Sequence, residues 1–580
     1  MYYNFDEKFE KGAKRAFNAE KRLNRLLEKM NGRLPDPVNF DTQTASADTP
    51  SDIRVARCSG DSWHLGYSQR SITPENVQNY YIGGNLSVPP RRAVGVLDDI
   101  KVRAVALSDG EGRPVEVFCA VDCIGLTNSA VGRIRSELDG FCRENGVACV
   151  NVLSTHAHSS VDTMGIWSVT GKKLLKNLSD LKKGKVLTPS VDSGFLSLVT
   201  QRVVEAAKEA VGRMQPGRLY LAQIGTNSVE KLNSAKKNDL QSVPLADYGV
   251  KAFTFAKRPP KEYSPRLNRL RFVPNDPNAA ETVIVNFGAH PYANGLKIKA
   301  NKGNMLSADF PFYMEKVINE AGDNFIFFNA AVNGIYPNRS AGGVKEEHFT
   351  RQTEALGGDL GRLVVAMTKK QDEIERDPLL CTEGRGEAYR DAVRRIGIEA
   401  VCERELEPKM TAAHKKITLK VENPLEKLIG KLGFACFDMQ RPKKGEYELM
   451  TETGYYELGD ENALKIVLVP GEITPGLVSG TGDMLADNSI TRQGSDFKSL
   501  IEAVGGDTAV FGLANDALGY IIPDNDYCMF FAGYGKLAEK LFFKGYAHYQ
   551  EMFSIGRHTA SEFSRAVENL AEEVNAHRQP

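Results

Sequence analysis

The sequence lacks an excess of charge of either sign, because 74 lysine and arginine residues balance 74 aspartate and glutamate residues. This balance gives no basic footprint of the kind that binds nucleic acid, so we expect no nucleic-acid partner. No GxGxxG or Walker-type segment follows a strand, which argues against nucleotide binding. The nine cysteines form no CxxC pair, and their odd number favours reduced, buried thiols over a disulfide framework or a thiolate zinc site.

Long apolar runs are missing as well. No stretch approaches the roughly 18 uninterrupted apolar residues of a membrane span, so we expect no transmembrane segment. The first residues, MYYNFDEKFEKGAKRAF, lack the apolar core of a secretory signal. Reduced thiols without an export signal predict a cytoplasmic location.

The first 54 residues differ in pattern from those that follow. Residues 5–31 set apolar side chains at helical spacing opposite a face of lysine and arginine, which predicts a basic amphipathic helix. Such a helix can bind a membrane surface, but docking on its own domain or on a second copy is the favoured interpretation. A homo-oligomer formed through this helix is therefore one alternative. Residues 32–54, rich in proline, serine and threonine, predict a linker or wrapping arm.

From residue 55 onward, short apolar runs alternate with helical patterns. The expected strands are 115–126, 148–155, 282–289, 324–331, 465–471 and 508–514. The expected helices are 128–145, 195–212, 310–320, 348–376, 390–407 and 559–577. Strands separated by helices predict a mixed α/β architecture. Several strands are apolar throughout, as expected where both faces are covered.

Four of these strands are followed by a side chain of the metal-ligand type. His156 and His158 follow the first in STHAHSS, and an H-x-H pair in extended chain can aim both imidazoles the same way. His290 follows the second, in GAHP, where the proline keeps the histidine out of helical geometry. Glu472 follows the third in VPGEIT, and Tyr520 follows the fourth in NDALGYI.

Each of these four signals is weak alone, because a histidine or carboxylate at a strand end is usually solvated and a tyrosine there usually packs. Their shared layout carries more weight, since open α/β sheets bind ligands at the carboxyl ends of their strands. Two imidazoles with one carboxylate form the ligand set of a hydrolytic zinc site that keeps a position open for water. The pattern therefore predicts a zinc site.

These segments resemble the neutral (non-lysosomal) ceramidase family. GYSQRSITP at 66–74 and GVLDDIKVRAVAL at 95–107 are similar to family segments, and all motifs keep the family order across roughly residues 60–555. The resemblance implies a large mixed-sheet α/β catalytic domain over 55–580, after an N-terminal helix and arm over 1–54. It implies the following zinc ligands: His156, His290, Glu472 and Tyr520. It also implies that His158 contacts the reacting carbonyl or passes protons.

The sequence departs from the family pattern in three places. At NAAVNGIYPN, 329–338, Gly334 stands at a family aspartate and Tyr336 at the serine required for ceramide turnover. A phenol does not fit the pocket of a hydroxymethyl group unchanged, so we expect a substrate other than ceramide. Ser160 and Val161 replace a Gly-Pro pair. The short, largely helical segment after Tyr520 predicts that the family's C-terminal immunoglobulin-like domain is absent.

The resemblance thus implies zinc-dependent hydrolysis of a carboxamide (N-acyl) bond in a small-molecule or lipid-like substrate. His158, Tyr520 and Tyr336 are the candidate catalytic residues, with Tyr520 serving as ligand or as donor to the tetrahedral intermediate. Asp122 and Asp309 are candidates for orienting the ligands, and capping of strand ends is an equal alternative for both. The rival functions are a catalytically inactive relative that binds a lipid or other amphipathic ligand, and an assembly role for the N-terminal helix.

Overall fold

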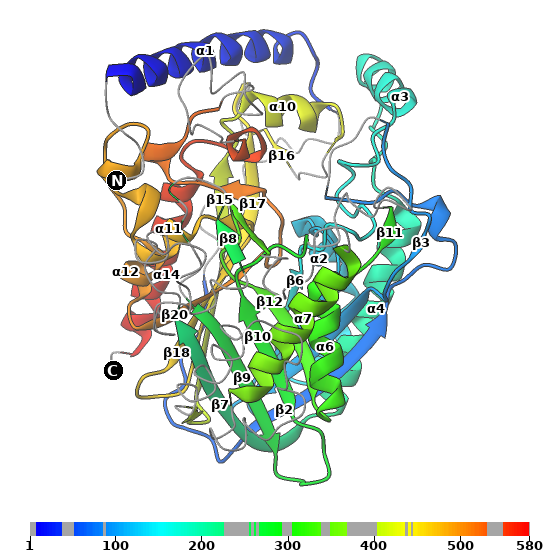
Figure 1. Cartoon of the computed structure of the whole chain (residues 1–580), viewed down its shortest axis with the longest axis vertical. Coiled ribbons are helices and arrows are strands. Elements are labelled where there is room, and N and C mark those ends of the chain that lie inside the picture. Colours follow the sequence, from blue (N-terminus) through cyan, green and yellow to red (C-terminus); the bar gives the residue numbers. More distant parts are fainter. Residues whose placement is uncertain are drawn as a thin grey trace.

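Two β-sheets lie face to face at the centre of the protein, and helices cover their outer faces (Figure 1). The structure is a computed structural model. It describes residues 7–37, 51–84, 89–225, 254–256, 260, 262, 266–292, 304–337, 349–367, 403–434, 439–441, 445–529 and 549–578. The predicted mixed α/β architecture is confirmed, with a layer order of helix, sheet, sheet, helix.

The larger sheet has nine strands in the order β12-β10-β9-β7-β2-β4-β5-β6, with β14 paired to β7. The pairs β10–β12 and β5–β6 are parallel, and the other pairs are antiparallel. Its strands are β2 (Trp63–Ser71), β4 (Lys101–Ser108), β5 (Val115–Val121), β6 (Val147–Ser154), β7 (Gln215–Gly225), β9 (Arg266–Pro274), β10 (Thr282–Phe287), β12 (Asn324–Asn329) and β14 (Arg404–Leu406).

The smaller sheet has the order β1-β15-β17-β18-β20, with β16 paired to β17 and a parallel pair β18–β20. Its strands are β1 (Asp52–Arg54), β15 (Met410–Lys420), β16 (Met439–Gln440), β17 (Glu448–Leu458), β18 (Leu464–Val469) and β20 (Asp507–Gly512). The two-stranded ribbons are β3 (Gly95–Val96) with β11 (Met305–Leu306), β8 (Thr254–Ala256) with β13 (Ile335–Pro337), and β19 (Glu472–Ile473) with β21 (Tyr520–Ile521).

Alternation along the strands explains the layers. In β4, Val102, Ala104 and Ala106 face the helices, whereas Val105 and Leu107 join the cluster between the two sheets. Successive side chains of a strand point to opposite faces, so a strand buried on both sides reads as a continuous apolar run. Three phenylalanines, one from the smaller sheet and two from the larger, meet edge-on or stacked in the central layer: Phe118, Phe328 and Phe511.

Helices cover both outer faces of this pair of sheets (Figure 1). On the larger sheet lie α2 (Asn128–Glu144), α4 (Ser193–Gly212), α6 (Phe310–Glu320) and α7 (Phe349–Ala366). On the smaller sheet lie α11 (Pro475–Ser479), α12 (Leu500–Val504) and α14 (Thr559–Arg578). The side chains of Thr127 and Asp192 cap the first turns of α2 and α4.

The N-terminal helix α1 (Glu7–Asn31) docks on its own chain, against α10 (Pro424–Lys431) (Figure 1). Leu27 packs in a cluster with Tyr527 and Met529, and Asn31 Nδ2 donates to the Pro424 carbonyl at 2.8 Å. The arm that follows ends in β1, which pairs with β15 of the smaller sheet. Among the described residues, no helix has the length and apolar character needed to cross a membrane.

One predicted helix is wrong in part. The pattern at 390–407 predicts a helix, but Arg404–Leu406 forms β14, while residues 390–402 lie outside the described part of the chain. The cause lies in β7. Residues 215–217 of this strand pair with β2, which leaves the backbone groups of residues 219–221 to pair with β14. Pairing of otherwise unmatched backbone groups outweighs helix propensity here. Of the helix expected at 348–376, residues 349–366 are helical and 368–376 lie outside the description.

Candidate metal centre

The structure brings together side chains from the carboxyl ends of four strands. His156 follows β6 and His290 follows β10 of the larger sheet, whereas Glu472 follows β18 and Tyr520 follows β20 of the smaller sheet. Glu472 and Tyr520 are register neighbours in the parallel ribbon β19–β21, which places their side chains on one face. The site therefore lies where the two sheets meet, and each sheet supplies half of the predicted ligands.

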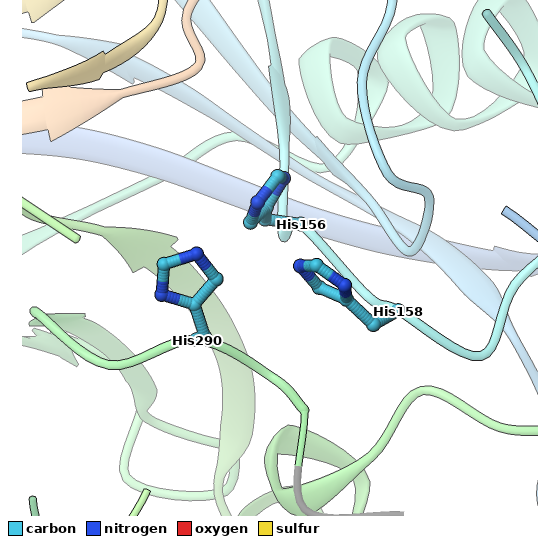
Figure 2. Close-up of side chains that lie close together, drawn as sticks. All are labelled: His156, His158 and His290. Atoms are coloured by element: carbon cyan, nitrogen blue, oxygen red, sulfur yellow. The ribbon is translucent and has the colours of Figure 1, made fainter. Parts of the chain in front are cut away.

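Three imidazoles converge at this seam, as Figure 2 shows for His156, His158 and His290. Their potential ligand atoms all lie within 4.8 Å of one another. Each Nδ1 bonds to a backbone carbonyl, that of Ile124 at 2.7 Å, Gly84 at 3.0 Å and Ile335 at 2.6 Å, respectively. A carbonyl only accepts, so each Nδ1 carries the proton and a neutral imidazole keeps the lone pair of Nε2 for the centre.

Glu472 lies against two of these imidazoles. One carboxylate oxygen is 3.2 Å from His156 Nε2 and the other is 2.9 Å from His290 Nε2. Burial raises the pKa of Glu472, but the positive charges that His156 and His290 carry when protonated outweigh burial and hold this pKa well below its usual range. Burial lowers the pKa of His156, and the Glu472 carboxylate reverses this, so the His156 pKa is raised.

His158 is in a different electrostatic position. Burial, together with the positive charges that His156 and His290 can carry, lowers the pKa of His158 well below its ordinary value. A neutral imidazole with a protonated Nδ1 presents only a lone pair at Nε2. His158 is thus neutral, and its lone pair is available to a cation.

Two nitrogen atoms at this centre test whether a metal fits. His156 Nε2 and His158 Nε2 are buried and have no hydrogen-bond partner, since the 3.2 Å contact of His156 with Glu472 lacks hydrogen-bond geometry. Leaving a buried polar atom unsatisfied is costly, and such atoms in native proteins call for an explanation such as an ion. Imidazoles whose other nitrogen is held by a carbonyl are typical of metal ligands. The donor set therefore fits a divalent cation.

The backbone at the centre takes unusual conformations. His156 has φ of 64°, in the left-handed region that a residue with a Cβ enters at a cost. Gly84 has φ of 95°, and a Cβ there would lie 2.7 Å from both the Cα and the Nδ1 of His158. Gly84 is therefore needed for the close approach of its carbonyl to the His158 ring.

Buried asparagines fasten the two sheets beside the centre. Asn286 Nδ2 donates to the Val510 carbonyl of the smaller sheet at 2.9 Å. Asn515 accepts from Val152 N at 2.8 Å and donates to Asn151 Oδ1 at 2.9 Å. These side chains satisfy backbone groups that neither sheet can pair alone, and they fix the strand ends that carry the histidines.

Tyrosines surround the imidazoles and the carboxylate. The Tyr336 ring stacks on His290 with centroids 5.1 Å apart and planes 9° apart. Its hydroxyl lies 2.8 Å from that of Tyr549, which lies 3.4 Å from that of Tyr520. Tyr292 meets the edge of His158 at 4.9 Å. Burial, followed by the Glu472 charge, raises the pKa of Tyr520, so its phenol stays protonated.

Sequence reasoning missed Tyr549, Tyr292 and the three carbonyl partners of the imidazoles. The two aspartates proposed for orientation hold backbone segments and a helix start. Asp122 forms a buried ion pair with Arg103 at 2.9 Å and accepts from Thr155 at 3.2 Å, so it holds the strand end before His156. Asp309 caps α6 by accepting from Phe310 N at 2.8 Å. Carbonyls carry no sequence signature, and neither tyrosine belongs to a motif.

A second group of potential ligands lies between β5, β6 and β15, formed by Glu116, Cys149 and His414. Arg54 pairs with Glu116, and Arg135 Nη2 lies 3.9 Å from Cys149 Sγ. Two guanidinium groups next to these side chains disfavour a further cation. We interpret this group as a polar network that joins the sheets.

The fold and the centre together define a large α/β/β/α protein with a histidine-rich site at the seam of its sheets. No protein-family model matches the sequence, and no curated protein matches it. Solved structures do: a neutral ceramidase from Pseudomonas aeruginosa has a TM-score of 0.55 at 14% identity, covering 89% of this chain and 75% of that chain. A ceramidase complexed with C2 has a TM-score of 0.53 at 14% identity, with coverages of 89% and 76%. The resemblance predicted from the motifs is confirmed at the level of the fold.

Proposed function

We propose that this chain is a zinc-dependent hydrolase of a carboxamide (N-acyl) bond. The observation that carries the proposal is that three imidazoles and a buried carboxylate meet at one place. Two of the imidazole nitrogens, His156 Nε2 and His158 Nε2, lack a hydrogen-bond partner. The fold shared with neutral ceramidases supports amide hydrolysis as the reaction class. Fold alone does not determine function, so the centre is the stronger support.

The proposed zinc ligands are His156, His290, Glu472 and Tyr520. Nitrogen and carboxylate donors suit zinc, which usually keeps one position for water in hydrolytic sites. When bound, the ion supplies an acidified water and polarises the scissile carbonyl. His158 Nε2, with its lone pair turned to the same centre, accepts a proton from the attacking water and returns it to the departing amine. As the alternative to holding the ion, the Tyr520 phenol would donate a hydrogen bond to the oxyanion.

We further propose that the substrate is a small or lipid-like N-acyl compound other than ceramide. Tyr336 stands where the family resemblance places a serine, and its ring stacks on His290. The ring fills space beside a proposed ligand that a serine would leave open. Its hydroxyl is held by Tyr549 at 2.8 Å, so the ring is fixed in place. Tyr336 would then act by limiting the size of the group next to the scissile bond.

Location and assembly remain predictions. A cytoplasmic location depends on the pattern of thiols, and six cysteines in the described part of the chain are free. Assembly through α1 would have to use its outer face, because its inner face is buried against α10 and residues 527–529.

Metal analysis combined with a screen of N-acyl substrates tests the function. We expect about one zinc ion per chain and zinc-dependent release of an acid and an amine. His290→Ala should lose both, whereas Lys316→Ala, on the exposed side of α6, should lose neither. Zinc binding without release of any acid or amine would favour the alternative, an inactive relative that binds an amphipathic ligand. Protein without zinc whose activity survives His290→Ala would refute the proposal.

A further inference from the structure

The outer face of α1 combines basic and apolar side chains. Residues spaced by three or four positions lie along one side of a helix. Toward its C-terminal end this side of α1 exposes Arg22, Arg25, Leu26, Lys29 and Met30, and Arg33 is exposed in the turn after the helix. The side chain of Leu26 is 56% exposed and that of Met30 is 42% exposed, which is unusual for large apolar side chains. The inner face, with Leu27, is already packed against the domain.

A second helix, α3 (Gly171–Lys182), has the same character together with the turn that follows it. Its exposed basic residues are Lys172, Lys176, Lys182, Lys183 and Lys185. Among them lie Leu175, which is 69% exposed, and Val186, which is 67% exposed. The opposite side of α3 is docked, since Asn177 and Leu181 are buried.

The two helices lie at one end of the molecule, and both are anchored at α10. Asn31, at the end of α1, donates to the Pro424 carbonyl at the start of α10, and Asn177 of α3 donates to the Leu432 carbonyl just after its end, both at 2.8 Å. Figure 1 shows α1, α10 and α3 gathered at the same end of the molecule. We call the two outer faces together the basic cap.

We propose that the basic cap docks on an anionic lipid bilayer. The whole chain has no net charge, so the concentration of lysine and arginine here is local rather than general. Of seven large apolar side chains strongly exposed in the part of the chain that the structure describes, four lie in the cap. Basic side chains that attract acidic headgroups, with apolar ones that enter the headgroup boundary, are the composition of interfacial helices.

Other occupants match the cap less well. Nucleic-acid phosphates would use the positive charge but give no favourable environment to Leu175, Val186, Leu26 and Met30. A bilayer uses both kinds of side chain. The inference goes beyond the proposed hydrolase activity and does not depend on it, since docking requires no metal.

The cap is also connected to the candidate metal centre. The segment after His158 is held by Asp162, which accepts from the backbone nitrogens of Met164, Gly165, Trp167 and Ser168 at 2.8–3.0 Å. This compact loop leads directly into α3 at Gly171. Docking through α3 would therefore place the lipid surface near the loop 162–168, which follows His158 in the chain.

Co-sedimentation of the full chain with vesicles tests the proposal. We expect binding to phosphatidylcholine vesicles that contain about one third phosphatidylserine, weak binding to phosphatidylcholine alone, and release at high salt. Replacing three cap lysines by glutamine (K182Q, K183Q, K185Q) should weaken binding on the order of a hundredfold. The apolar pair L175S and V186S should weaken binding to anionic vesicles by roughly tenfold or more, because each side chain loses its contact with the acyl boundary.

A matched control uses the same kinds of change elsewhere on the surface. Leu485 is 47% exposed and Lys316 lies on the exposed side of α6, so L485S with K316Q should bind vesicles like the unmodified chain. Three results would overturn the inference: no binding to anionic vesicles, equal loss in the control variant, or equal binding to neutral vesicles. Binding to double-stranded DNA that ignores L175S and V186S, with no vesicle binding, would assign the cap to nucleic acid instead.

Discussion

Replacing His290 by glutamine should remove most of the affinity for zinc while leaving the fold intact. His290 Nε2 lies 2.9 Å from Glu472 and its Nδ1 lies 2.6 Å from the Ile335 carbonyl, so this imidazole joins the carboxylate to β13. Glutamine keeps a similar size and can still donate to the carbonyl. It cannot replace the imidazole lone pair that faces the centre.

The expected magnitude follows from the role of the side chain. Loss of a group that merely orients a ligand costs 10–100-fold in metal affinity, so loss of the ligand itself should cost about a hundredfold or more. At free zinc a hundred times the dissociation constant, zinc stabilises the unmodified chain by about 2.7 kcal/mol. After a hundredfold loss of affinity, the same zinc concentration would stabilise the variant by only about 0.4 kcal/mol.

Competition for zinc with a chromogenic chelator measures this change directly, and His158→Gln is the matched comparison. Because His158 is proposed to move a proton rather than hold the ion, its variant should keep zinc affinity within about tenfold and lose activity by about a hundredfold or more. Wild-type zinc affinity in the His290 variant would refute the proposed centre. Equal losses of affinity in both variants would mean that His158 is itself a ligand.

Three further predictions address the seam between the sheets, the polar network around His414 and the tyrosines of the centre. Asn515→Ala should lower the free energy of unfolding by about 2–4 kcal/mol in denaturant titrations, because it removes two buried hydrogen bonds at φ of 60°; a loss below about 0.5 kcal/mol would contradict the role of Asn515 at the seam. Burial lowers the pKa of His414, but the neighbouring Cys149 and Glu116 raise it to about 10, above the ordinary 6.5. The stability this provides is complete below pH 6.5 and is lost as the pH rises to 10, so His414→Gln should flatten the pH profile of unfolding over that window; an unchanged slope would disprove this reasoning. Tyr549→Phe should lower kcat by about tenfold because the Tyr336 ring loses the contact at 2.8 Å that fixes it beside the scissile bond, while zinc affinity stays the same; a change in affinity instead would place Tyr549 among the groups that hold the ion.

The six strands expected from the sequence lie at or near their predicted positions, but the long strands β7, β9, β15 and β17 were not predicted. The apolar run predicted as a strand at 282–289 corresponds to β10 at Thr282–Phe287, and the helix predicted at 310–320 has those limits. Hydrophobic periodicity is a local property, so it survives without knowledge of the fold. The exception at Arg404–Leu406 depends on a free stretch of β7, which is distant in sequence.

The division of the strands into two stacked sheets could not be predicted. Both faces of β4 and of β18 carry apolar residues. The apolar sequence pattern of a strand does not show whether a given face packs against a helix or against another sheet. Parallel pairing of β5 with β6 and of β18 with β20 is likewise set by tertiary contacts.

The gathering of the candidate side chains at one place could be predicted because the four motifs share one position at strand ends. His156, His290, Glu472 and Tyr520 do lie together across the seam, although their roles at a metal stay predictions. The left-handed backbone of His156 and the close approach of Gly84 to His158 were not foreseen. Such features depend on atoms brought close by the fold rather than on residue type.

The order of strands along the chain has a consequence for biosynthesis. The larger sheet is complete, apart from β14, by residue 329, whereas β15, β17, β18 and β20 of the smaller sheet all lie after residue 409. On the ribosome, the inner apolar face of the first sheet must therefore wait uncovered until a long further stretch has emerged. Nascent chains with such a face are prone to aggregate. The domain should consequently depend on chaperones until its last strand is translated. A chain that terminates before Glu472 should aggregate rather than keep partial activity.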